Sequence, residues 1–94
     1  MTVHYVKSWT HLFAAFLRGI KTHDMRIMDR PYEVGDTLVL REYDKQTETY
    51  TGRAARAEIT YITSRDHVPC AFSTSALREN YAILSIRKIE DAKS

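Results

Sequence analysis

Little in this chain favours covalent cross-links, metals or membranes. Its 94 residues include one cysteine, three glycines and two prolines. Cys70 therefore has no partner for an internal disulfide, and four histidines with no other cysteine do not suggest a structural zinc site. The longest apolar run, Leu12 to Leu17, is too short to cross a bilayer, and the first residues lack the layout of a signal peptide. The sequence predicts a cytoplasmic protein with no cofactor, no metal and no membrane contact.

An excess of charge of one sign is also missing. Lys and Arg number 14 against 12 Asp and Glu, so the formal net charge is +2, and any binding of nucleic acid must come from a local patch. Hydrophobic residues make up 44% of the chain, which is ordinary for a globular domain. We expect one domain over residues 1–94, with a polar tail from about residue 90. Because the chain is too small for a deep cavity, a ligand site should be a surface cleft.

The clearest periodic pattern predicts a helix over residues 9–18. Ser8 is a good N-cap, and Gly19 suits the left-handed residue at which many helices end. Helical spacing gathers the bulky apolar residues on one face, which we expect to be buried: Trp9, Leu12, Phe13, Phe16, Leu17 and Ile20.

Strand patterns occupy most of the remaining chain. Residue types and alternation predict strands at Thr2–Lys7, Lys21–Met28, Thr37–Tyr43, Arg53–Thr63 and Tyr81–Ile89. We expect Asp44–Gly52 to form a long hairpin tip and Ala76–Glu79 a short helical turn. One helix near the start and about five strands predict an α+β domain with a curved or barrel-like sheet, and the helix covers one open side of it.

Strand alternation also assigns faces to side chains. Asp24 and Arg26 fall on one face of the second strand, and Met25 falls on the other. On the return strand of the hairpin, Ile59 and Tyr61 share a face. Basic and acidic residues interleave along the hairpin, which predicts an ordinary mixed-charge surface: Arg41, Arg53 and Arg56 with Glu42, Glu48 and Glu58.

Several segments together resemble a known family. They are the opening strand with His4 and Lys7, the stretch Gly19 to Arg26, Asp29-Arg30, Val34 to Asp44, Tyr50 to Arg53, Ile59 to Ile62 and Tyr81 to Ile86. In this order the chain resembles the DUF3850 family of small bacterial and phage domains, in the ASCH group of the PUA-like superfamily. The resemblance implies a PUA-like pseudobarrel with one N-terminal helix packed at its side. It also implies a cleft between helix and sheet that binds RNA or nucleotides, with the Gly-x-Lys segment at its rim.

The candidate binding residues are Lys21, Thr22, Asp24, Arg26, Arg30 and His4. An arginine fork pairs bidentately with phosphate, and lysine supplies a point charge. One base would stack on an aromatic ring, and Tyr32 and Tyr50 are expected to be exposed. A solvated strand, with Asp24 and Arg26 paired for solubility, explains the same pattern. For His4 the alternative is a hydrogen-bonded residue of the barrel.

Two other functions stay open. Some ASCH relatives resemble enzymes, either amidohydrolases acting on acetylcytidine or small ribonucleases. The resemblance then implies that Lys21 is the base or electrophile, with Asp24 or Glu58 as its partner. A phage accessory protein that binds a host protein is the third interpretation, since the net charge is small. Binding of RNA or a nucleotide-like ligand, rather than catalysis, is the expectation.

Overall fold

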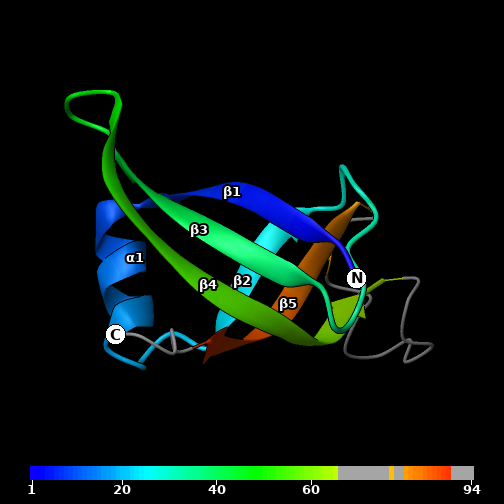
Figure 1. The fold of residues 1–94 in the computed structure, drawn as a ribbon. Helices are drawn as coiled ribbons and strands as arrows, with labels where there is room; N and C mark the ends of the chain where they lie inside the picture. Colours follow the sequence, from blue (N-terminus) through cyan, green and yellow to red (C-terminus); the bar gives the residue numbers. More distant parts are fainter. Residues whose placement is uncertain (66–76, 78–79, 90–94) are drawn as a thin grey trace.

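The computed structural model describes residues 1–65, 77 and 80–89. Along the chain these form β1 (Val3–Trp9), α1 (Thr10–Leu17), β2 (His23–Ile27), β3 (Thr37–Asp44), β4 (Thr49–Ser64) and β5 (Tyr81–Ile89) (Figure 1). The predicted helix and the five predicted strands are therefore confirmed. Cys70 and the polar tail from residue 90 lie outside the described residues, as does the predicted turn at Ala76–Glu79 apart from Leu77.

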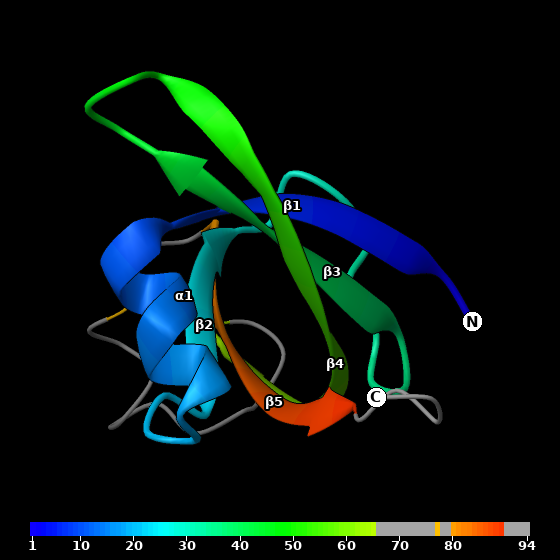
Figure 2. The same ribbon diagram turned by 60° about the vertical axis from the view of Figure 1, so that its left-hand side comes forward.

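The strands form one mixed sheet in the order β1-β3-β4-β5-β2. β1 runs parallel to β3, and the other neighbouring pairs are antiparallel. The sheet curls, so that β2 and β5 lie behind β1, β3 and β4, with α1 beside the curl (Figures 1 and 2). The two edge strands, β1 and β2, approach each other closely enough for a side chain of β2 to reach the backbone of β1. This arrangement is the predicted α+β pseudobarrel with one helix at its side.

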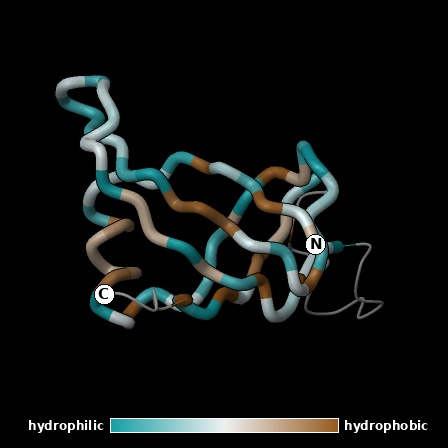
Figure 3. The backbone as a smooth tube through the Cα atoms, viewed as in Figure 1, coloured by the Kyte–Doolittle hydropathy of each residue, from teal (hydrophilic) through white to brown (hydrophobic). Residues whose placement is uncertain are grey.

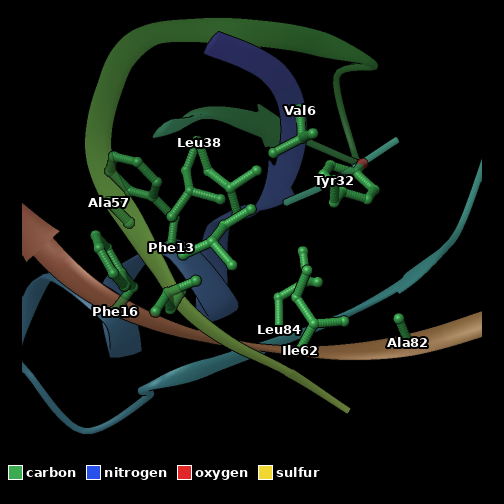
Figure 4. Close-up of a cluster of buried hydrophobic side chains, with 12 residues drawn as sticks. Val6, Phe13, Phe16, Tyr32, Leu38, Ala57, Ile62, Ala82 and Leu84 are labelled. Atoms are coloured by element: carbon green, nitrogen blue, oxygen red, sulfur yellow. The ribbon is translucent and has the colours of Figure 1, made fainter. Parts of the chain in front are cut away.

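A buried hydrophobic cluster fills the inside of the curl (Figure 4). The helix contributes Phe13 and Phe16, which are 1% and 3% exposed. The predicted burial of the whole apolar helix face is wrong, because Trp9, Leu12 and Ile20 are 41%, 36% and 66% exposed. A helix of 8 residues has only two turns, and it brings one narrow stripe against the sheet. The hydropathy of the sheet also varies along its strands: the middle of β3 is apolar, and the hairpin tip is polar (Figure 3).

The two ends of α1 differ in how they are closed. Ser8 is not the N-cap as predicted; it is the last inward-facing residue of β1, and Trp9 occupies the cap position with no side-chain cap hydrogen bond. The C-terminal end is confirmed, since Gly19 adopts a φ of 79°. Its N–H donates to Phe16 O and the following N–H donates to Ala15 O, both at 3.0 Å, which is the Schellman pattern. The backbone that leads to Lys21 is therefore fixed by this glycine.

Replacing Gly19 by alanine is expected to lower the free energy of unfolding by about 1–2 kcal/mol, because an L side chain is strained at this φ. The space around a Cβ there is open, so the effect reports backbone conformation and not a clash. Gly19→Asn should lose less, since asparagine tolerates the left-handed region. Urea unfolding of the three proteins measures this; an alanine variant as stable as the glycine protein would contradict it.

β4 is interrupted at two bulges. The first faces Arg41 to Tyr43 of β3 and contains Gly52, whose φ is 95°, so this glycine lies within the strand and not in the hairpin tip. The second shifts the register with β5 between Ile59 and Tyr61. Because a bulge inserts one extra residue, the alternation changes phase there. The prediction that Tyr61 shares the inner face of Ile59 is therefore wrong: Tyr61 is 54% exposed, and Ile62 is buried in its place.

Candidate functional site

The polar face of β2 points into the barrel. Asp24 is 7% exposed, whereas Met25 and Ile27 on the other face are 55% and 45% exposed. β2 is an edge strand that pairs only with β5, and its polar side faces the interior of the curl beneath α1. The predicted alternation of β2 is confirmed. The alternative interpretation, a strand whose polar face is solvated, does not fit, because the Asp24 carboxylate is buried.

Two cations hold this buried carboxylate. Lys21 Nζ lies 3.2 Å from Asp24 Oδ1, and Arg26 Nε lies 2.7 Å from Asp24 Oδ2. Lys21 Nζ also donates to the carbonyl of His23. A buried carboxylate needs such partners, since an uncompensated charge there costs several kcal/mol. The three residues that the sequence grouped as a cluster are thus in direct contact.

Two arginines close the seam between the edge strands. Arg26 Nη2 donates to the carbonyl of Lys7 at 2.7 Å, and Arg30 Nη1 donates to the carbonyl of Tyr5 at 3.4 Å. Arg30 Nε also lies 3.5 Å from Asp29 Oδ1. Guanidinium groups therefore occupy backbone acceptors that a neighbouring strand would use in a continuous sheet. Side chains thus hold the β1 edge of the seam.

A cleft follows this seam and is divided at Arg26. One part, of about 460 Å³, is lined by residues that include Tyr5, Arg26, Arg30, Tyr32 and Tyr81. The other, of about 280 Å³, lies between Asp24, Arg26 and the helix side at Trp9 and Leu12. The predicted cleft between helix and sheet corresponds to the second part. The first part extends it along the seam and brings in Arg30.

The tyrosines of the cleft differ from expectation. Tyr32 was predicted to be exposed and is 4% exposed; burial raises the pKa of its hydroxyl, and the Arg30 guanidinium lies 5.7 Å from the ring centre. Tyr5, which sequence reasoning did not single out for the cleft, is 62% exposed and lines it. The exposed ring of the cleft is therefore on the edge strand and not in the loop.

Lys21, Thr22 and His4, three of the six predicted binding residues, lie apart from the cleft lining, as does Glu58. Thr22 is exposed, and its carbonyl accepts the N–H of Ile86 at 3.0 Å. Lys21 reaches the site only through Asp24. Glu58, the alternative partner of Lys21 in a hydrolase, forms an ion pair with Arg87 in a different cleft. Of the two carboxylates considered for catalysis, only Asp24 meets Lys21.

His4 is used inside the barrel. Its Nε2 lies 2.8 Å from Asp36 Oδ2, its ring packs at 4.7 Å from that of Tyr32, and the residue is 5% exposed. Asp36 also accepts the N–H groups of Thr2 and Glu33, at 3.1 and 3.0 Å. Burial raises the pKa of Asp36, but the hydrogen bonds from His4 and the two backbone N–H groups outweigh it, so the pKa lies below its usual value. The carboxylate of Asp36, in the segment just before β3, therefore anchors the first strand.

Glu42 is a third buried carboxylate, after Asp24 and Asp36, and the sequence did not single it out as a site residue. It is 5% exposed and accepts hydrogen bonds from Arg53 Nε at 2.8 Å and from the hydroxyl of Thr51 at 2.7 Å. These bonds lower the pKa of Glu42, and the same contact raises the pKa of Arg53. Arg53 is therefore committed to Glu42, on the inner side of the hairpin.

The family model described as "Domain of unknown function (DUF3850)" matches residues 3–86. The chain belongs to the DUF3850 family. The match includes all of β1 to β4 and the six predicted site residues, so the seam and its cleft lie within the DUF3850 domain.

A relative of known sequence comes from Escherichia phage P2. It is described as "Uncharacterized 12.9 kDa protein in GpA 3'region" and is 41% identical over 61 residues, which are 65% of this chain and 54% of the relative. The match thus spans about half the length of that protein.

Within residues 1–65, 77 and 80–89, no three His, Cys, Asp or Glu side chains gather closely enough to hold a metal ion. In the same part of the chain no helix is long and apolar enough to cross a membrane.

Proposed function

We propose that the chain binds RNA or a nucleotide-like ligand in the cleft along the seam between β1 and β2. The observation that carries this proposal is the convergence of two guanidinium groups, Arg26 and Arg30, with the rings of Tyr5 and Tyr81 in one cleft of about 460 Å³. Guanidinium groups pair with phosphate, and aromatic rings stack on bases. The ASCH assignment suggested by the sequence stays a prediction that agrees with this use of the cleft.

Both guanidinium groups keep donors for a ligand. A guanidinium has five N–H groups, and the contacts within the chain engage two nitrogens of Arg26 and two of Arg30. Contacts to β1 and to the carboxylates hold each fork in place before a ligand arrives. Such preorganisation reduces the entropy lost on binding.

The decisive variant is Arg30→Gln. Arg30 makes one exposed ion pair and one exposed hydrogen bond within the chain, so the variant should fold. Because Arg30 lines the cleft, its replacement should weaken the binding of short single-stranded RNA about tenfold, the effect of one lost charge-assisted contact. The salt dependence of binding should also become shallower, because one phosphate contact is removed. Fluorescence anisotropy with labelled RNA at two salt concentrations measures both.

Arg87→Gln is the matched control. It also removes one positive charge and one surface ion pair, that with Glu58, but in another cleft. Its affinity should stay within about twofold of the parent. Equal losses in the two variants would mean that only net charge matters and would overturn the assignment. Lys21→Ala and Arg26→Ala are less suitable, because each leaves the buried Asp24 with one partner fewer.

A hydrolase is the second candidate, and the 3.2 Å contact between Lys21 Nζ and Asp24 Oδ1 favours it. In this alternative the pair acts on a modified nucleoside or on RNA. Incubation of the purified protein with acetylcytidine and with labelled RNA separates the candidates, since a binding module leaves both intact. Turnover that is lost in Asp24→Asn would replace the binding proposal by this one.

A further inference from the structure

The outer face of β1, β3 and β4 is a second surface with a defined pattern. These strands lie side by side (Figure 1), and their register aligns the outward side chains in rows that cross all three strands. The row nearest the hairpin tip consists of Trp9, Tyr43 and Tyr50. We call this row with its neighbouring cations, Lys7, Arg41 and Lys45, the outer platform.

Cations accompany each ring of the outer platform. Lys7 Nζ lies 4.1 Å from the centre of the Tyr43 ring, and the Arg41 guanidinium lies 4.1 Å from that of Tyr50. Lys45 Nζ lies 4.3 Å from the ring of Trp9. The rings of Tyr43 and Tyr50 meet edge to face at 5.2 Å. Three cations and three aromatic rings are thus gathered in one exposed area.

Two of the acidic residues that interleave with these cations in the sequence are paired with arginines outside the outer platform. Glu42 points inward to Arg53, and Glu58 lies on the row farthest from the tip, paired with Arg87. Asp44 accepts the N–H of Gln46 within the turn. Within the described part of the chain, no carboxylate forms an ion pair with Lys7, Arg41 or Lys45. Strand alternation thus turns Glu42 inward, whereas Glu58 shares the outer face with Arg56 and Glu48 is exposed at the hairpin tip, in agreement with the predicted mixed-charge surface of the hairpin.

We propose that the outer platform binds single-stranded nucleic acid, with bases stacked on Trp9, Tyr43 and Tyr50 and phosphates on the neighbouring cations. A net charge of only +2 is no obstacle, since the positive charge is concentrated where the rings are. Aromatic rings and cations in one groove or face are the general means of binding single strands. The outer platform shares Lys7 and Trp9 with the lining of the seam cleft, but Tyr43, Tyr50, Arg41 and Lys45 do not line that cleft, and the proposal does not depend on the function proposed for the cleft.

The spacing of the platform suits a stretched single strand. Neighbouring strands of a sheet lie about 4.8 Å apart, somewhat more than the roughly 3.4 Å between stacked bases. Each cation rests 4.1 to 4.3 Å from a ring centre, so a base that stacks on the ring displaces the flexible cation to the side of the base, where it can meet a phosphate. A duplex keeps its bases paired inside and cannot use the rings. Preference for single strands therefore follows.

Tyr50→Ala tests the platform. Tyr50 is 44% exposed, so the variant should fold, and its affinity for a ten-nucleotide oligouridine should fall about fivefold to a hundredfold, the effect of one lost stacking ring. Trp9 is the only tryptophan of the chain, and stacking on it should quench its fluorescence when the oligonucleotide binds. Tyr50→Phe keeps the ring and should bind as the parent does.

Tyr61→Ala is the matched control, because Tyr61 is also an exposed tyrosine of β4 but lies beyond the second bulge. Oligouridine, its DNA equivalent and a duplex of equal length distinguish RNA, any single strand and unspecific attraction. Because Trp9 also borders the seam cleft, the supporting result is a loss of affinity in Tyr50→Ala and not in Tyr61→Ala, together with quenching of Trp9 that persists in Arg30→Gln. No effect of Tyr50→Ala, equal binding of the duplex, or no binding at all overturns it. Because Arg30→Gln tests the seam cleft alone, failure of either site is recognised separately.

Discussion

Replacing Phe13 by alanine is expected to lower the free energy of unfolding by about 3–5 kcal/mol, the cost of removing a large buried ring. Phe13 is 1% exposed and joins α1 to the core of the barrel, with Leu38 and Ala57 in the same cluster. Domains of this size are stable by only about 5–15 kcal/mol, so the loss is a large share. Urea unfolding followed by circular dichroism measures it.

Leu12→Ala is the control for this prediction. Leu12 lies one residue before Phe13 in the same helix but is 36% exposed, so its truncation should cost no more than about 1 kcal/mol. A helix of 8 residues without a side-chain N-cap has little stability of its own. Alanine is the better helix former, so similar losses in both variants would show that apolar contact along the whole helix, and not the packing of one ring, holds α1 in place.

Asp36→Asn is expected to remove about 1.5–3 kcal/mol near neutral pH, because hydrogen bonds to a charged acceptor are the strong ones. The carboxylate of Asp36 joins His4, Thr2 and Glu33, at 2.8, 3.1 and 3.0 Å. It thereby fastens the start of β1 to the turn before β3. Free energies of unfolding of the parent and the variant measure the effect.

The dependence of this loss on pH has a definite sign. The pKa of Asp36 is lower in the folded chain than the ordinary value of 3.8, so as the pH is lowered below 3.8 the unfolded chain binds the proton first and the free energy of unfolding decreases. The difference between parent and Asp36→Asn should therefore be full above pH 3.8 and shrink below it. Asp44→Asn, which loses one hydrogen bond in an exposed turn, is the control. A difference that stays constant down to about pH 2 would contradict the prediction.

Local signals predicted the elements of this fold well. Periodicity of 3.6 residues located α1, and Gly19 marked its end because only a left-handed residue completes that turn. The phase of burial was harder to predict. Alternation gives β2 two faces but does not say which one is inside, and the bulge near Thr60 reverses the faces of β4. Such features depend on pairing with distant strands, which a local pattern does not contain.

The candidate site was predictable in part for the same reason. Lys21, Asp24 and Arg26 are near one another in sequence, and they meet. The partner of His4 is 32 residues away, so it follows only from the position of the turn before β3. The sequence did not predict that Trp9, Tyr43 and Tyr50 form one row, because they align only when three strands are in register.

The contacts across the seam also affect how readily the protein aggregates. An uncovered sheet edge is a template on which strands of other molecules add, and this leads to fibres unless the edge is protected. Here Arg26 and Arg30 occupy carbonyls of β1 that an invading strand would need as acceptors. Their positive charges also repel the identical edge of a second copy. The two side chains that line the ligand cleft thus also protect the β1 edge from pairing with other molecules. Substitutions of Arg26 or Arg30 that are made to improve affinity would expose this edge and promote aggregation.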